Sequence, residues 1–303
     1  MFLITGVYEG VYKLIPFAGE RLSEYLSIPS SELEQENKND NLLAGELHSP
    51  YSILVRLKDH KVVLKNRSEE RIYPASLTKI MTTIVAIENI SDLEETMILP
   101  KKIFHDLYEA NASMAGFLPG EEVLAIDLLN GTMLPSGADA SIGLANGISG
   151  SEKEFVKLMN KKAKELGMED TNFTNVTGLH NDNHYTTVQD IGILLEYTLK
   201  NDTFLQIFTT ERHFTSSTNL HSGGITFYST LSQKIGTYEF NGGRILGGKT
   251  GYTKEAGLCL ASLAEMNGTE YILVTAGAKG NSHTEQYHIT DAFTVYTNFL
   301  ESY

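Results

Sequence analysis

The stretch Ser76-Leu77-Thr78-Lys79 places a serine and a lysine three residues apart at the start of an amphipathic segment. A helix with one face toward a core is predicted by the apolar residues that follow at three- and four-residue steps, namely Leu77, Ile80, Met81, Ile84 and Ile87. Residues i and i+3 share a helical face, so we expect the Lys79 amine to reach the Ser76 hydroxyl. A serine hydroxyl becomes a nucleophile when a neighbouring base takes its proton, and a lysine shifted toward neutrality is such a base.

Ser76 is expected in the first turn of this helix, where unpaired backbone N–H groups and the helix dipole favour a developing negative charge. Taken alone, the tetrapeptide has another interpretation, because serine is a common N-cap and lysine is a common surface residue of helices. Two further motifs follow along the chain, Pro135-Ser136-Gly137-Ala138-Asp139-Ala140 and Lys249-Thr250-Gly251. The order of the three motifs favours a nucleophilic serine over a capping one.

These motifs resemble those of the active-site serine penicillin-recognising enzymes, whose signature is S-x-x-K, a serine-centred triplet and K-T-G. Within that superfamily the chain is most similar to the low-molecular-mass D-alanyl-D-alanine carboxypeptidases. The similarity extends from about residue 49 to the C-terminus, and its carrying segments are residues 73–83, 128–140, 186–190 and 247–257.

The resemblance implies a mixed α/β (α+β) fold of the β-lactamase and DD-peptidase type. In that fold an antiparallel five-stranded sheet is flanked by helices and carries an inserted helical subdomain. The sequence pattern agrees, because it predicts strands at both ends of the domain and helices between them. The predicted strands are residues 52–57, 61–64, 244–248, 257–264 and 270–278, and the predicted helices, besides the one at Ser76, are residues 121–133, 151–166, 188–199 and 282–300.

Two regions are predicted, an N-terminal segment with a polar linker (residues 1–45) and a catalytic domain (residues 46–303). The composition of residues 27–41 is polar and charged, which is typical of a linker. Residues 1–7 are apolar but lack a basic n-region, so they form neither a full signal peptide nor a membrane span. They are compatible with a remnant of one, which leaves a membrane tether open. By resemblance, we expect the protein outside the cytoplasm, at the cell envelope.

The composition is that of an ordinary acidic enzyme domain. Twenty-four Lys and Arg residues stand against 38 Asp and Glu residues, which gives a formal charge of −14 in 303 residues. This balance argues against nucleic acid and against an anionic membrane surface as partners. A carboxylate substrate therefore needs a local cationic spot. Cys259 is the only cysteine, so no internal disulfide forms.

The predicted chemistry is acyl transfer without a cofactor or a metal ion. Ser76 attacks the carbonyl of a terminal D-Ala-D-Ala bond with Lys79 as the general base, and D-alanine leaves. Ser136 passes the proton to the leaving nitrogen. Water then hydrolyses the acyl-enzyme. The partners that the resemblance implies are peptidoglycan stem peptides ending in D-Ala-D-Ala and β-lactam antibiotics.

The K-T-G motif is predicted to bind the substrate. Lys249 and Thr250 would hold its terminal carboxylate through charge-assisted hydrogen bonds, with Gly251 as the third member of the motif. By resemblance, the backbone N–H groups of Ser76 and Tyr252 would form the oxyanion hole, which contributes about 3 kcal/mol per donor.

Related activities stay open as alternatives. A transpeptidase differs only in using an amine instead of water as the acyl acceptor. A β-lactamase is less favoured, because no E-x-x-L-N segment lies between Ser136 and Lys249. A non-catalytic penicillin-binding protein is a further alternative, since Ala138 stands where the family usually has the asparagine of Ser-x-Asn. The sequence also leaves open a routine cell-wall role or one in glycopeptide resistance.

Two unrelated site types are disfavoured by their context. Residues 243–250 (GRILGGKT) match the phosphate-loop pattern G-x-x-x-x-G-K-[ST], but glycines and a strand-like stretch follow instead of a helix. His180 and His184 flank Asn and Asp residues close to Gly178, which is typical of a turn whose side chains cap their own backbone. We therefore expect neither a nucleotide nor a metal site.

Overall fold

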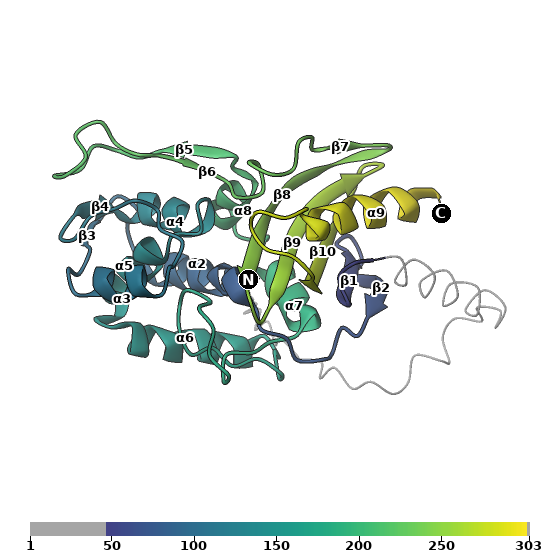
Figure 1. Ribbon diagram of the computed structural model, residues 1–303, viewed down its shortest axis with the longest axis horizontal. Coiled ribbons are helices and arrows are strands. Elements are labelled where there is room, and N and C mark those ends of the chain that lie inside the picture. The colour runs from purple at the N-terminus through teal and green to yellow at the C-terminus, as the bar shows by residue number, and fades with distance from the viewer. Residues whose placement is uncertain (1–46, 302–303) are drawn as a thin grey trace, which may run out of the picture. The chain divides into compact units, whose positions relative to one another are not determined.

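Strands from both ends of the chain form one antiparallel sheet in the computed structural model, which describes residues 47–301 (Figure 1). The strand order is β2-β1-β10-β9-β8-β7. The strands are β1 (Tyr51–Arg56), β2 (Lys61–Asn66), β7 (Glu239–Phe240), β8 (Gly243–Thr253), β9 (Gly257–Met266) and β10 (Thr269–Ala278). The five longer strands are the expected sheet, and β7 adds a two-residue edge. The predicted N-terminal segment and linker lie outside the described residues.

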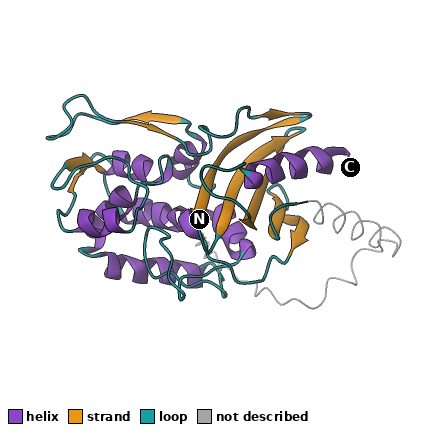
Figure 2. Cartoon of the chain, viewed as in Figure 1, coloured by secondary structure: helices purple, strands orange, loops and turns teal. Residues whose placement is uncertain are grey.

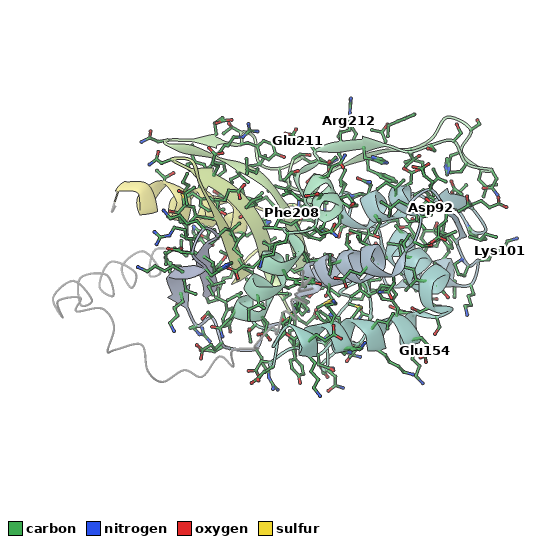
Figure 3. All side chains as sticks on the ribbon, turned by 180° about the vertical axis from the view of Figure 1, so that it is seen from behind. Asp92, Lys101, Glu154, Phe208, Glu211 and Arg212 are labelled. Carbon is green, nitrogen blue, oxygen red and sulfur yellow. The ribbon has the colours of Figure 1, made fainter. Side chains whose placement is uncertain are left out.

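Both faces of the sheet are buried, which explains why its strands are apolar almost without interruption. Ile53 and Val55 of β1 pack into one core together with the helices, whereas Leu54 between them joins a second core on the opposite face. Helix α9 (Tyr287–Glu301) covers that second face, and α7 (Val188–Thr198) and α8 (Asp202–Thr209) cover the first (Figure 2). Seen from behind, Figure 3 places Phe208 of α8 against the sheet.

The helices inserted between β2 and β8 form the predicted helical subdomain. They are α2 (Thr78–Asn89), α3 (Ile103–Glu109), α4 (Ala125–Met133), α5 (Ala138–Ser149) and α6 (Glu152–Glu165), followed by α7 and α8. Two hairpins accompany them, made by β3 (Thr96–Ile98) with β4 (Glu122–Leu124) and by β5 (Arg212–Phe214) with β6 (Thr226–Tyr228). None of the helices in residues 47–301 has the length and apolar character to cross a membrane.

Three predicted boundaries were wrong. The helix expected at 121–133 begins at Ala125, because Glu122–Leu124 pairs with β3. The helix expected from residue 282 begins at Tyr287, since a turn closed by Asn281 N–H and the Thr284 hydroxyl (2.8 Å) precedes it. Strand β8 runs on to Thr253 instead of ending at residue 248, because it pairs with β9 along its length. The phosphate-loop alternative fails for the same reason, since residues 243–250 are strand and not a loop that opens a helix.

Candidate active site

Ser76 lies in a 3₁₀ turn (Ala75–Leu77) directly before α2 and not, as predicted, in the first turn of the α-helix. The tighter turn keeps the i and i+3 relation. Lys79 Nζ donates a hydrogen bond to Ser76 Oγ at 3.3 Å. Ser76 is half-buried, whereas Lys79 is only 2% exposed. The contact expected from the spacing is therefore present, with the amine closed off and the hydroxyl accessible.

Two glycine backbones hold the turn that carries Ser76. A Cβ on Gly178 would lie 1.8 Å from the carbonyl oxygen of Ala75, and one on Gly251 would lie 3.1 Å from the Ser76 nitrogen. Ala75 itself has φ 46°, a left-handed conformation that a side-chain-bearing residue adopts at a cost. The serine is thus fixed between β8 and the loop at Gly178, which leaves its backbone little freedom to shift.

The Lys79 amine is buried. Besides Ser76, its Nζ donates to the backbone carbonyl of Thr177. Burial lowers the pKa of Lys79 to about 7, although the negative charge of Asp139 acts in the opposite direction. A lysine with this pKa is partly neutral near pH 7, so its nitrogen can accept a proton.

A second buried lysine contacts the second motif serine. Lys249 Nζ donates to Ser136 Oγ at 3.0 Å and to its neighbour's carbonyl oxygen, Thr250 O, at 3.0 Å. Burial holds the pKa of Lys249 well below its usual value, and the positive charges of Lys79 and Lys234 lower it further. Ser136 sits in the turn between α4 and α5 with φ 64°. The structure therefore brings the second and third motifs together.

A cleft of about 680 Å³ reaches the second of these pairs, because Ser136 lines it, whereas Ser76, Lys79 and Lys249 are not among its lining residues. Its lining includes Ser136, Thr250, Gly251 and Tyr252, four of the predicted site residues. Gly251 connects the cleft to Ser76, because its Cα faces the backbone of that serine. The side chain of Tyr252 is exposed, so its ring is free to contact a ligand in the cleft.

The residues that follow Ser136 are anchored away from the cleft. The carboxylate of Asp139 accepts backbone N–H groups from Ala115 at 2.7 Å and from Gly116 and Phe117 at 3.1 Å each. Three consecutive backbone N–H groups thus hold this carboxylate. Ala138 is 2% exposed.

Two histidines that the sequence raised as metal ligands have structural roles. His184 Nδ1 accepts the Thr174 N–H at 3.0 Å, and its Nε2 lies 2.8 Å from Thr78 Oγ1. Burial lowers the pKa of His184 to about 4. The ring of His180 instead meets Tyr73 edge-on, with 4.7 Å between the ring centroids. The predicted turn is confirmed, and the two side chains serve different contacts.

Sequence reasoning missed four residues of this region. Thr177 supplies a carbonyl to Lys79, Gly178 supports Ala75, and the hydroxyl of Thr230 lies 2.7 Å from that of Thr250. Lys234 lines the cleft. These residues act through backbone atoms or lie in turns that carry no motif. Only Gly178, a glycine beside a predicted turn, could have been noticed in the sequence.

We expect Gly178→Ala to slow acylation of Ser76 by about a hundredfold, because the new Cβ must displace the Ala75 carbonyl and the serine with it. Gly167→Ala is the matched control. Gly167 has a similar φ of 76°, but no atom lies within 4 Å of a Cβ there. In both variants an alanine must adopt a left-handed conformation, which lowers the free energy of unfolding, measured in urea, by about 1 kcal/mol. Equal acylation rates in the two variants, measured with fluorescent penicillin, would contradict the positioning role of Gly178.

The sheet and the inserted helices give the chain the fold of the DD-peptidases and β-lactamases, and two serine–lysine contacts lie within that fold. Residues 35–280 match the D-alanyl-D-alanine carboxypeptidase family, and the chain belongs to that family.

Individual relatives agree with this family. The chain is 35% identical to the D-alanyl-D-alanine carboxypeptidase DacF of Bacillus subtilis over 251 residues, which are 82% of this chain and 62% of that protein. It is 32% identical to the D-alanyl-D-alanine carboxypeptidase of Streptomyces strain K15 over 212 residues, 68% of this chain and 72% of the relative. The crystal structure of the Streptomyces K15 DD-transpeptidase superposes with a TM-score of 0.75 at 25% identity, covering 85% of this chain and 98% of the other.

Proposed function

We propose that the protein is a serine D-alanyl-D-alanine carboxypeptidase whose nucleophile is Ser76. The single observation that carries this is the 3.3 Å contact between the buried Lys79 amine and Ser76 Oγ in a chain of this family. Ser76 Oγ attacks the carbonyl carbon of the terminal D-Ala-D-Ala bond and gives its proton to Lys79 Nζ. The C–N bond breaks and D-alanine leaves. Water then attacks the ester carbonyl and the C–O bond to Ser76 breaks. Ser76 Oγ takes its proton back from Lys79 Nζ, and the proton that water loses returns to Lys249 through Ser136.

Ser136 and Lys249 form the second half of the proposed mechanism. The leaving nitrogen of D-alanine needs a proton, and Ser136 Oγ donates it. The 3.0 Å hydrogen bond from Lys249 Nζ supports this step, because the lysine can replace the proton that Ser136 gives away. Thr250 and Gly251 line the cleft where the terminal D-alanine would bind. The N–H groups of Ser76 and Tyr252 are proposed to bind the oxyanion.

The substrate class follows from the family. We infer that the natural substrates are peptidoglycan stem peptides ending in D-Ala-D-Ala, that β-lactams acylate the same serine, and that the protein works at the cell envelope. The boundary of the catalytic domain near residue 46 and an N-terminal membrane tether remain proposals. The chain spans 62% of the length of the Bacillus relative.

Product analysis tests the proposed function. A muropeptide ending in D-Ala-D-Ala is incubated with the protein, with and without an amine acceptor, and the masses of the products are determined by mass spectrometry. Loss of one alanine indicates a carboxypeptidase, whereas gain of the amine indicates the transpeptidase alternative. A DD-transpeptidase among the similar structures justifies that second arm. If the peptide stays intact and labelled penicillin forms no adduct, the proposed function is wrong.

We expect Ala138→Asn to be acylated by penicillin at least as fast as the wild type. The family's asparagine adds an amide that orients the lysine and the substrate, and one such hydrogen bond contributes about 1–3 kcal/mol. Because Ala138 is 2% exposed, added volume has its own cost there. Ala138→Leu is therefore the control for bulk without an amide. A slower Asn variant whose Leu counterpart is unchanged would mean that alanine serves another ligand contact.

A further inference from the structure

The cleft continues past Thr250 to a group of basic side chains that the mechanism above does not use. Lys234 and His288 line this end. Lys234 belongs to the same turn as Thr230, whose hydroxyl lies 2.7 Å from that of Thr250. The positive charge of Lys234 acts on both Lys249 and His288, lowering the pKa of each. Lys234 and His288 therefore share the cleft lining with Thr250 of the K-T-G motif.

Lys234 has no acidic partner among the residues that the structure describes. Its Nζ donates to the neutral Gln286 Oε1 at 3.0 Å. Glu255, the acidic residue in the cleft lining, lies 4.0 Å from His180 instead. An exposed ammonium without a counter-ion, in a protein of net charge −14, leaves this end of the cleft locally cationic.

His288 provides an independent sign of a ligand. Its side chain is 1% exposed, and Nδ1 has no hydrogen-bond partner within the described chain. A buried polar nitrogen without a partner costs free energy, and because His288 lines the cleft, a molecule bound there can supply the missing hydrogen bond. Burial lowers the pKa of His288 to about 3, so the ring is neutral at pH 7 and can donate through one nitrogen.

Lys249 is poorly placed to carry the charge of a carboxylate by itself. Two of its three donors are already used by Ser136 Oγ and Thr250 O. A buried lysine whose pKa is held down by its surroundings is better suited to proton exchange with Ser136. The carboxylate then needs another cation at the same end of the cleft.

We propose that Lys234, assisted by His288, binds the C-terminal carboxylate of the substrate, while Lys249 serves Ser136. This inference rests on the proposed function and names the residue that recognises the chain end. A carboxylate between an ammonium and an imidazole N–H gains charge-assisted hydrogen bonds. An internal peptide bond offers no negative charge at that position. Lys234 thereby makes the enzyme select a free C-terminus.

Two substrates and three variants test the assignment. Values of kcat/KM are measured for a peptide ending in D-Ala-D-Ala and for the same peptide with a C-terminal carboxamide. In Lys234→Met, kcat/KM for the free acid is expected to fall about tenfold to a hundredfold, whereas kcat/KM for the carboxamide should change little. The preference for the free acid is then largely lost. Lys234→Arg keeps the charge and most of the preference. Lys254→Met is the control, because Lys254 is an exposed lysine that lines the same cleft.

His288→Phe keeps a ring of similar volume but removes the nitrogens. It is expected to reduce the preference by a smaller factor, with the unfolding temperature measured alongside to separate binding from stability. Equal losses on both substrates in Lys234→Met would overturn the assignment, and so would an equal loss of preference in Lys254→Met. If wild type is acylated by penicillin but shows no preference for the free acid, only the carboxylate assignment fails. If wild type is neither acylated nor active, the proposed function fails first.

Discussion

Ser76→Ala is expected to release no D-alanine and to form no penicillin adduct, while it unfolds at nearly the same temperature as the wild type. The hydroxyl is the only proposed acyl acceptor, and removing a catalytic serine of this kind typically lowers turnover by at least about 10,000-fold. The fold loses little, because Ser76 is half-buried and Lys79 keeps its hydrogen bond to the Thr177 carbonyl. We expect a change in the free energy of unfolding of about 1 kcal/mol or less.

Intact-protein mass after exposure to penicillin measures the adduct directly. Ser113→Ala is the matched control, since Ser113 lines the cleft and has no role in the proposed mechanism. It should be acylated like the wild type. A penicillin adduct retained on Ser76→Ala would show that another residue is the nucleophile. Loss of the adduct in both variants would point to a disturbed cleft instead of a lost acceptor.

The sequence pattern located the strands, and the resemblance implied their antiparallel sheet, but neither gave the length of β8. This strand was expected to end at residue 248, and it continues through Gly251 to Thr253, although glycines are unfavourable in strands. The structure explains those glycines through close packing. A Cβ on Gly247 would lie 2.4 Å from the Phe208 carbonyl of α8, and one on Gly251 would meet the turn at Ser76. Such approaches depend on the packing of distant segments, so propensities cannot reveal them.

The error at 121–133 has a different cause. A short apolar run fits a buried helix and a buried strand equally well. Glu122–Leu124 becomes a strand because Thr96–Ile98 lies beside it, a pairing that local sequence does not encode.

Motifs located both partners of the two serine–lysine contacts, and the structure supplied further partners such as the Thr177 carbonyl. The spacing of Ser76 and Lys79 predicted their contact, since both lie on one short turn of chain. No spacing predicts that Lys249 reaches Ser136, because 113 residues separate them. The family order of motifs provided that link. Lys234 had no such signal, and only its place beside the K-T-G strand shows that it shares the cleft.

Acylation of Ser76 is expected to rise with pH and to reach half of its maximal rate near pH 7. The sign follows from the role of Lys79: a general base must be unprotonated, and the unprotonated fraction of an amine grows as the pH rises through its pKa. Burial sets the pKa of Lys79 at about 7. Near pH 5 only about 1% of the amine is then neutral, so the rate should fall about a hundredfold below its maximum.

Lys79→Met tests whether that titration belongs to this residue. Methionine has a similar length, but it offers no nitrogen to take the serine proton, so acylation should fall by about a thousandfold or more. The residual acylation rate of this variant should no longer show a pH midpoint near 7. Single-turnover labelling with fluorescent penicillin from about pH 5 to about pH 9 measures both effects. A rate that does not change with pH in the wild type, or an undiminished rate in Lys79→Met, would refute the general-base role. If the variant is slow but keeps the wild-type midpoint, the titrating group is the other buried lysine, Lys249, and the base is reached through Ser136.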